Sequence, residues 1–246
     1  MSWLITPTQN AFITDADARA YVNAVEAADR QTLEPAVTQA IVDFVVGCKS
    51  DEVWNAIKAS CILAGARSLA GALVPLKGAA PTNNNYTDSD YNRKLGVLNA
   101  SGKSISSNRL NDADPQDNNH NSVYLTFTGS VNMVALGGGN NILSRTSNNR
   151  ARFANRGAAV GFGNNSLLNV SFYGTSRSIS SEYIVQTNTT SSTVSQVSST
   201  PTSDNIQIAS AGSVRVTFYS IGESLDLALL SARVTTLMSD IAAAIP

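Results

Sequence analysis

The chain contains little of what enzymes commonly use for catalysis. Its 246 residues include one histidine, two cysteines and only 14% charged residues, against about 25% in an average globular protein. A single histidine argues against a serine–histidine–aspartate or cysteine–histidine site, because no acid near it is clearly placed to orient the ring. The polar surface must therefore be built from serine, threonine and asparagine, and we expect it to rely on hydrogen bonds more than on charge.

The scarcity of cysteine and of long apolar runs excludes further classes. Cys48 and Cys61 lie in apolar sequence typical of buried free thiols, so no disulfide framework is expected. The most apolar stretch, residues 59–76, is interrupted by Arg67 and Pro75, so no membrane span is predicted. The opening residues, MSWLITPTQN, contain neither the basic nor the apolar region of a signal peptide, and none is expected.

Charge and acid positions favour neither nucleic-acid binding nor glycoside hydrolysis. The formal net charge is −1, so no nucleic-acid partner is expected. Glycoside hydrolysis needs two carboxylates about 5–9 Å apart. Of the acids in the middle of the chain only Glu182 lies outside turn-like sequence, and it has no acidic neighbour two or four residues away. We therefore predict a protein that is not an enzyme.

The first 71 residues are predicted to form an N-terminal helical segment. Asp15 and its neighbours suit the start of one helix, and Pro35 suits the first turn of a second helix that would end at Gly47. A third helix is expected to begin near Ser50, to carry Trp54, Ile57 and Cys61 on one side, and to stop near Gly65.

Residues 72–220 are predicted to form a β-sandwich of the jelly-roll type. Short segments with alternating or β-branched residues recur every 8–15 residues, separated by Gly, Asn and Ser clusters and with no helix between them. The main ones are NSVYLTF, LLNVSFYG, SEYIVQT and SVRVTFYS, and the shorter ones are RKLGVL, VNMVAL, NILSRT, RARFAN and NIQIAS. This pattern is typical of two packed antiparallel sheets. The Ser- and Thr-rich residues 187–203 suit either a long loop or an exposed hairpin.

Residues 221–246 are predicted to form an amphipathic C-terminal helix. The stretch from Ser220 to Glu223 has the form of a capping box. The stripe that follows has heptad-like spacing and consists of Leu227, Leu230, Val234, Leu237 and Ile241. Two interpretations remain open: the helix packs on the N-terminal helices of its own chain, or it forms a seam with a neighbouring subunit.

The segment NDADPQDNNHN, residues 111–121, is the strongest candidate for a metal site. Asp112, Asp114 and Asp117 have a spacing that could bring several oxygens to calcium, although the EF-hand pattern is absent. The alternative is a solvated turn whose Asp and Asn side chains bond their own backbone. His120, which lies just before a predicted strand, is expected at the surface.

A carbohydrate-binding groove is a further candidate site. Such a groove needs an aromatic ring on which a sugar can stack and amides that bond its hydroxyls. Asn84 and Tyr86, together with Tyr173 or Tyr183, could supply these groups.

Several stretches resemble a group of phage- and prophage-encoded proteins with a concanavalin-like (LamG-type) lectin sandwich. They cover about half of the chain, at both ends of the predicted sandwich: DFVVGCKSDEVWNAIKASCILAGARSLAGALVPLKGAAPTNNNY, DYNRKLGVL, SNRLNDADPQDNNHNSVYL and FYSIGESLDLALLSARVTTLM. The resemblance implies a virion or tail-fibre surface protein made in the host cytoplasm. It implies no defined ligand and no catalytic residues.

The expected function is therefore structural. A tail-fibre or receptor-binding protein that contacts other virion proteins or a host-surface glycan is the first interpretation. A capsid decoration protein and a carbohydrate-binding module are the alternatives. A homo-oligomer, most simply a trimer, is expected in each case.

Overall fold

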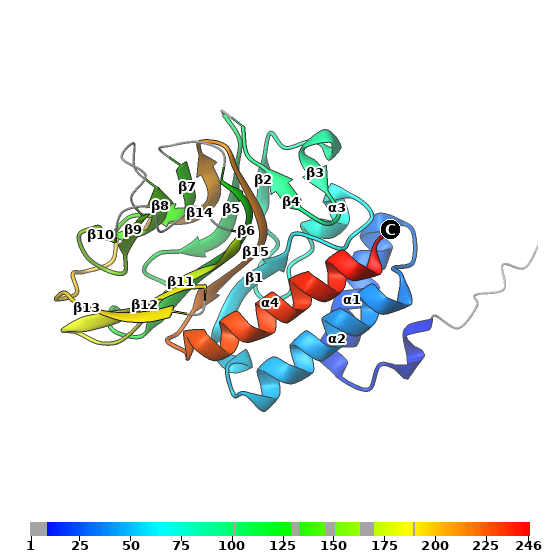
Figure 1. Cartoon of the computed structure of the whole chain (residues 1–246), viewed down its shortest axis with the longest axis horizontal. Coiled ribbons are helices and arrows are strands. Elements are labelled where there is room, and N and C mark those ends of the chain that lie inside the picture. The colour runs from blue at the N-terminus through cyan, green and yellow to red at the C-terminus, as the bar shows by residue number, and fades with distance from the viewer. Residues whose placement is uncertain (1–8, 101, 129–132, 146–150, 163–169, 189) are drawn as a thin grey trace, which may run out of the picture.

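The computed structural model describes residues 9–100, 102–128, 133–145, 151–162, 170–188 and 190–246. Within them, two antiparallel sheets pack face to face, and three long helices cover the outer side of one sheet (Figure 1). The predicted mainly-β sandwich with N-terminal helices and a C-terminal helix is thus confirmed. The helices are α1 (Ala16–Asp29), α2 (Pro35–Ser50) and α4 (Leu227–Ala244), with a one-turn α3 (Leu69–Ala72) between them in sequence.

Sheet A, as described, contains eight strands. Along its main path they run in the order β13 (Thr190–Ser195), β12 (Glu182–Thr187), β11 (Ser171–Ile179), β6 (Asn119–Thr128), β15 (Val214–Gly222), β4 (Gly96–Leu98) and β3 (Tyr91–Asn92). The eighth strand, β1 (Ile57–Ile62), pairs antiparallel with β15 outside this path.

Sheet B contains the other seven described strands. Their order is β10 (Val160–Phe162), β9 (Ala151–Ala154), β8 (Asn141–Arg145), β7 (Met133–Gly138), β14 (Asn205–Ala211), β5 (Ser104–Leu110) and β2 (Thr82–Asn84). The chain crosses repeatedly between the sheets, for example from β5 to β6 and from β14 to β15, so each sheet is built from segments that are distant in sequence. Residues 187–203 include the β12–β13 hairpin, one of the two forms expected for that segment.

Two apolar cores lie on opposite faces of sheet A. Val123, Val216 and Tyr219 point into the core between the sheets. Phe172 and Phe218 point the other way, into the core beneath the helices. The Phe218 ring meets Phe44 of α2 edge to face, with ring centroids 5.6 Å apart and an interplanar angle of 72°. Sheet A is therefore buried on both sides.

Helices α1 and α4 start at aspartate caps. The carboxylate of Asp15 accepts hydrogen bonds from the backbone N–H groups of Asp17 and Ala18, both at 3.0 Å. Asp226 does the same for α4, accepting from Ala228 at 2.8 Å. The predicted capping box at Ser220 is wrong, because Ser220 lies in β15 and the helix begins seven residues later, at Leu227.

The predicted third helix is also wrong. A short 3-10 turn, Trp54–Ala56, leads into strand β1, whose residues are almost all buried. β1 is covered on one face by helices and on the other by sheet B, so it lacks the alternation that marks a half-buried strand. It belongs to sheet A, and the predicted domain boundary near residue 71 therefore separates elements that the structure joins. Helix α2 continues three residues beyond the predicted end at Gly47.

The apolar stripe of α4 packs within its own chain. Leu230, Val234 and Ile241 are fully buried in the core shared with α1, α2 and sheet A. The interpretation of this stripe as an intersubunit seam is therefore wrong, and intramolecular packing is confirmed. By length and composition α4 could also cross a membrane, a property that it shares with core helices of this kind.

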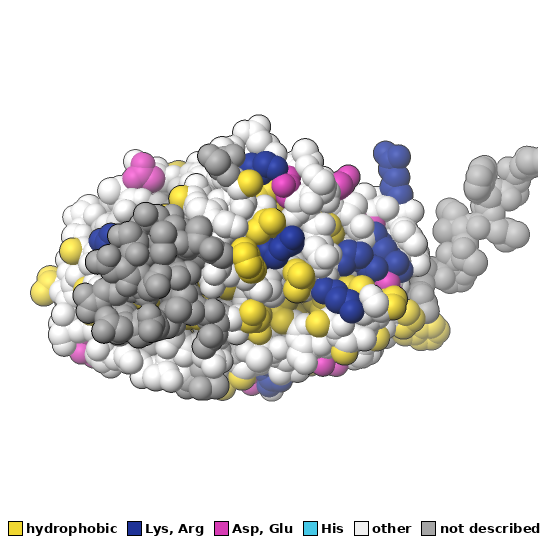
Figure 2. Space-filling model, turned by 45° about the horizontal axis from the view of Figure 1, so that its top comes forward, with side chains coloured by type: hydrophobic (Ala, Val, Ile, Leu, Met, Phe, Trp, Pro, Cys, Tyr) yellow, Lys and Arg dark blue, Asp and Glu magenta, His cyan; other side chains and the backbone are white. Residues whose placement is uncertain are grey.

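Much of the surface is polar without being charged, as the composition predicted. On the face in Figure 2 most of the described surface is white, the colour of the backbone and of side chains that are neither apolar nor charged. A group of apolar side chains lies near the middle of that face, with Lys and Arg beside it.

Adjacent leucines of α4 provide a matched test of this packing. We expect Leu230→Ala to lower the free energy of unfolding by about 2–5 kcal/mol, because it leaves a cavity beneath the helices. Leu229 is 40% exposed, and Leu229→Ala should lower the free energy of unfolding by under about 0.5 kcal/mol. Chemical denaturation measures both. Equal losses would contradict the assignment of Leu230 to the core.

Candidate functional site

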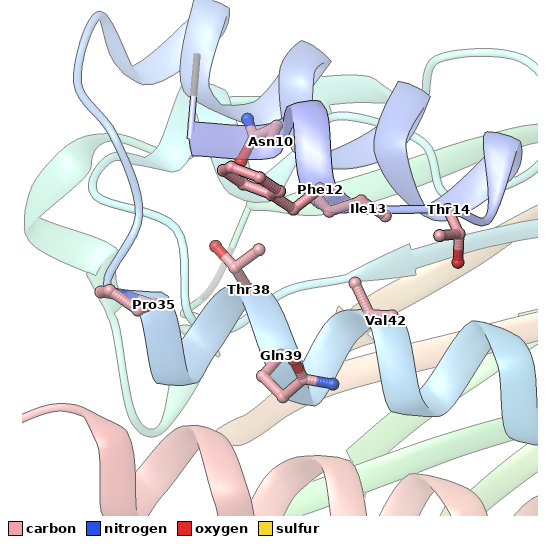
Figure 3. Close-up of a pocket in the computed structure, with 8 residues that line it drawn as sticks. All are labelled: Asn10, Phe12, Ile13, Thr14, Pro35, Thr38, Gln39 and Val42. Atoms are coloured by element: carbon pink, nitrogen blue, oxygen red, sulfur yellow. The ribbon is translucent and has the colours of Figure 1, made fainter. Parts of the chain in front are cut away.

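A pocket of about 350 Å³ lies between the first described residues and α2, and we call it the Phe12 pocket. Figure 3 shows Phe12, Ile13 and Thr14 along one side and Thr38, Gln39 and Val42 of α2 along the other. The Phe12 ring is 88% exposed, which is unusual for a large apolar side chain. Asn10 anchors this segment because its amide donates to Asn23 at 2.9 Å and to Glu26 at 2.7 Å. The pocket is uncharged, and its lining combines apolar side chains with amides and hydroxyls.

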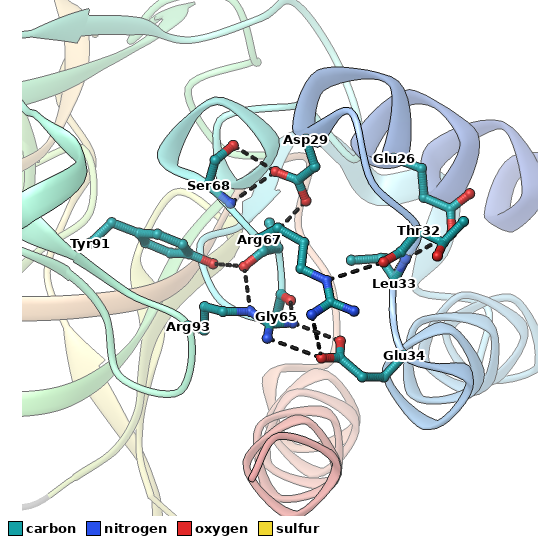
Figure 4. Close-up of polar contacts among 11 residues, drawn as sticks. Glu26, Asp29, Thr32, Leu33, Glu34, Gly65, Arg67, Ser68, Tyr91 and Arg93 are labelled. Carbon is teal, nitrogen blue, oxygen red and sulfur yellow. Dashed lines mark hydrogen bonds and ion pairs between the residues drawn. The ribbon is translucent and has the colours of Figure 1, made fainter.

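A polar junction ties the helices to the sandwich (Figure 4). Glu34 at the start of α2 bridges Arg67 at 2.9 Å and Arg93 at 2.6 Å. Burial alone would raise the pKa of Glu34, but the hydrogen bond and charge of Arg93, with the charge of Arg67, lower it overall. The carboxylate of Asp29, at the end of α1, accepts from the backbone N–H groups of Arg67 and Ser68 at 2.6 and 2.9 Å. The charged groups of this junction are paired with one another or with backbone N–H groups, and they hold the helices against the sandwich.

The predicted metal segment is buried at several positions and exposed at others. Asn111, Asp114 and His120 are buried. Asp114 is bound by Arg109, with Nη2 to Oδ1 at 2.5 Å. Asp117 accepts from the Ser198 hydroxyl at 2.5 Å, whereas Asp112 is exposed. No group of three His, Cys, Asp or Glu side chains that could hold a metal exists among the described residues. The structure therefore does not bring the three aspartates together as calcium ligands.

The same end of the sandwich contains two buried arginines. Arg156 Nη1 donates to Asn111 Oδ1 at 2.5 Å, and its Nη2 donates to the Asp114 carbonyl at 3.3 Å. Arg177 is held by main-chain carbonyls, including that of Asn155 at 2.9 Å. We call this group of buried amides, carboxylates and guanidiniums the polar layer. Sequence reasoning missed it because asparagine-rich sequence is usually solvated.

His120 is fully buried, and the prediction of a surface histidine is wrong. Its Nδ1 lies 2.6 Å from the Glu223 carbonyl, which can only accept, so Nδ1 must bear the proton. Nε2 then accepts from the Ser220 hydroxyl at 2.7 Å. Serine and histidine thus meet at the distance of a nucleophile and its base. Both are fully buried, and a carbonyl instead of an acid orients the ring, so this pair is structural.

The tyrosines of the predicted sugar groove are buried between the sheets. Tyr86, Tyr173 and Tyr183 all belong to that core, so their rings cannot stack on a sugar. The Tyr86 hydroxyl bonds Asn99 and the Ala209 carbonyl, both at 3.0 Å. Asn84 is half-buried and donates to Ser104 at 3.0 Å. The predicted groove is therefore wrong, because Tyr173 of β11 and Tyr183 of β12 lie on the inner faces of their strands and Tyr86, in the loop after β2, also packs into this core.

A second surface pocket of about 350 Å³ combines charge, an aromatic ring and backbone strain. We call it the Trp54 pocket, and its lining comprises Asp17, Lys49, Glu52, Trp54, Asn55 and Lys77. The ammonium of Lys77 lies 4.5 Å from the centroid of the Trp54 ring and that of Lys49 lies 5.6 Å from it. Burial lowers the pKa of Lys77, helped by the charges of Lys58 and Lys49 and opposed by Asp17.

Glu52 adds the strain. It follows the last turn of α2 with a φ of 61°, where glycine is favoured. Its N–H bonds the Lys49 carbonyl at 3.1 Å, and the Val53 N–H bonds the Cys48 carbonyl at 3.0 Å, so the left-handed turn closes the helix. Backbone strain and a shifted pKa each occur often at functional sites, and this pocket has the first at Glu52 and the second at Lys77. Sequence reasoning assigned the region to a helix and missed this pocket.

Comparisons with known proteins name no family. No protein-family model and no curated protein matches this sequence. Two similar solved structures are the Trypanosoma rangeli sialidase with 2,3-difluorosialic acid and a mutant of that sialidase with trans-sialidase activity. Identity is 11% for both, TM-scores are 0.44 and 0.42, and coverage of this chain is 90% and 82%. The chain spans only 38% and 39% of those chains, and likenesses this weak carry no conclusion about function.

The buried histidine predicts an unusual titration. Burial lowers the pKa of His120 to about 4 from the ordinary 6.5, although the hydrogen bond to Glu223 opposes this. A lowered folded-state pKa means that stability is complete above pH 6.5 and is lost as the pH falls toward 4, by up to about 3 kcal/mol. NMR of the single imidazole should show a midpoint near pH 4 in the folded chain. The same ring in the denatured chain provides the reference, and a folded midpoint near 6.5 would contradict the burial.

The strain at Glu52 predicts a stabilising change. Glu52→Gly should raise the free energy of unfolding by about 1 kcal/mol, because glycine tolerates a φ of 61°. Asn55→Gly, at an exposed neighbour without positive φ, should not stabilise and serves as the control. Denaturant unfolding compares the two. A loss of stability in Glu52→Gly would mean that the carboxylate contributes more to folding than the strain costs.

Proposed function

We propose that this protein is a non-enzymatic surface component of a phage particle, docked to other particle proteins through its helical layer. The resemblance of the sequence to phage sandwich proteins supports the proposed location on a phage particle. The distribution of pockets supports the docking face. Four pockets of about 350 to 410 Å³ lie on the helical layer, including the Phe12 pocket and the Trp54 pocket. This distribution is the observation on which the proposal depends.

The sandwich offers less to a ligand in its described part. Its three candidate tyrosines are core residues, and the polar layer is buried and bonded to other side chains and to main-chain carbonyls. The buried His120–Ser220 pair and the pairing of Asp114 with Arg109 support a role without catalysis. Within the proposal, the helices face the particle and the sandwich faces outward. This arrangement fits a capsid decoration protein better than the tail-fibre role.

A receptor-binding tail-fibre role is the second candidate. Strand β13 is an edge of sheet A, and its exposed side chains are almost all hydroxyls: Thr190, Ser191, Thr193 and Ser195. Such a row could bond the hydroxyls of a host-surface glycan. A trimer remains a prediction in either role, and it requires a surface other than the buried stripe of α4.

Two exposed apolar residues test which side docks. Val46 of α2 is 45% exposed, and Leu110 of β5 is 43% exposed. We expect Val46→Asp to reduce the amount of protein that co-purifies with particles at least about tenfold, because a charge must then be buried in the interface. Leu110→Asp should leave incorporation unchanged. Quantitative immunoblots of purified particles measure both, with melting curves confirming that the variants fold. The reverse pattern would assign docking to the sandwich.

A further inference from the structure

The Trp54 pocket contains a positive charge that its own carboxylates do not neutralise. Lys49 pairs with Asp15 and Asp17, each at 2.7 Å. Lys58 on the neighbouring strand pairs with Glu223 at 3.2 Å. Lys77 makes no ion pair within the part of the chain that the structure describes. Asp15, Asp17 and Glu223 are therefore paired with other lysines, and the ammonium of Lys77 lines the cavity without an ion-pair partner among the described residues.

The backbone holds Lys77 in place. Its carbonyl accepts from the Ser60 N–H at 3.1 Å, and the Ser60 carbonyl accepts from Leu76 at 2.8 Å, so the segment is fixed to β1. Gly78 follows with a φ of +83°, and a Cβ there would lie 2.5 Å from the Lys58 carbonyl oxygen. Only glycine allows this close crossing. The backbone of Lys77 is thus fixed before any ligand arrives, and its ammonium lies over the Trp54 ring, which reduces the ordering that binding requires.

The rim of the pocket supplies polar groups of both kinds. Asn55 and Glu52 are exposed there, one with an amide that can donate and one with a carboxylate that can accept. Glu52 keeps its strained φ where glycine would relieve it. Asp17 and Glu52 also place negative charge beside the single unpaired cation. A doubly charged anion such as phosphate would be repelled more than a singly charged one.

We propose that the Trp54 pocket binds a single carboxylate group on a small polar body. The Lys77 ammonium is the counter-charge, the Asn55 amide donates a hydrogen bond, and Glu52 accepts one from a hydroxyl or amide of the ligand. The cavity of about 350 Å³ lies within the range of small-ligand sites. A peptide carboxylate and a sugar acid share this chemistry, and separate probes distinguish them.

Fluorescence of Trp54 provides the assay, because the Lys77 ammonium lies over its ring. Trp3 is the other tryptophan of the chain, and Trp3→Phe leaves Trp54 as the sole reporter. We expect a saturable emission change at millimolar concentration with N-acetylglycine, with D-glucuronate, or with both. The probe that binds more tightly identifies the source of the carboxylate. N-acetylglycine methyl ester and inorganic phosphate, at matched ionic strength, should give no saturable change.

Variants assign the response to Lys77. Lys77→Gln should weaken binding at least about tenfold, the loss of one charge-assisted contact, and Lys77→Arg should retain it. Lys94→Gln removes a lysine from the β3–β4 turn, outside the pocket, and should behave as the parent protein does. Affinity should also fall as the pH rises through the pKa of Lys77, because only the protonated ammonium attracts a carboxylate. Burial lowers that pKa, the charges of Lys58 and Lys49 lower it further, and the charge of Asp17 opposes them.

The proposal would be overturned by the absence of a saturable response of the parent protein to either acid, or by equal binding by a folded Lys77→Gln protein. If Lys77→Gln fails to fold, the affinities of the acid and of its methyl ester are compared in the parent protein and in Lys77→Arg, and this comparison tests the proposal. Ester binding as tight as that of the acid would also overturn it. None of these results bears on docking through the helical layer, which Val46→Asp tests separately.

Discussion

Burial of both faces of sheet A is the constraint on which the rest of this structure depends. Its central strand β15 has almost no contact with water, because Tyr219 faces sheet B and Phe218 faces the helices. Each buried apolar square ångström contributes roughly 25 cal/mol, so uncovering either face would be costly. The helices therefore cover the face of sheet A that sheet B leaves open. The pockets between and beside them are a consequence of that packing.

The parts of the fold that were predicted from sequence are those whose signal is local. β6, β11, β12 and β15 are rich in β-branched and aromatic residues, and β6, β12 and β15 were located to within two residues, whereas the predicted β11 overlaps only the first part of the observed strand. β1 was assigned to a helix because a strand buried on both faces has no alternation. The stripe of α4 was recognised, but the capping pattern at Ser220 was overridden by pairing with β6. A short sequence motif does not determine the local structure where tertiary contacts favour a different one.

The sites were much harder to predict because their partners are distant in sequence. Arg156 reaches Asn111 across 45 residues, and Ser220 reaches His120 across 100. By composition alone, residues 111–121 look like a solvated turn. Their polar groups can be buried only because these distant partners form hydrogen bonds with them. Lys77 likewise meets Trp54 only because the chain crosses β1 at Gly78. The reverse error, three tyrosines expected at the surface, has two causes: the inner face of β11 and β12 was not known for Tyr173 and Tyr183, and Tyr86 packs into the core from a loop.

Hydrogen exchange under native conditions tests most directly whether helices and sandwich form one folding unit. If sheet A depends on its helical cover, amides of α2 and α4 should open with the same free energy as those of β15, equal to the global free energy of unfolding. Exchange from the helices at a markedly lower free energy, with β15 and β14 still protected, would show that the sandwich stands alone and would contradict this account.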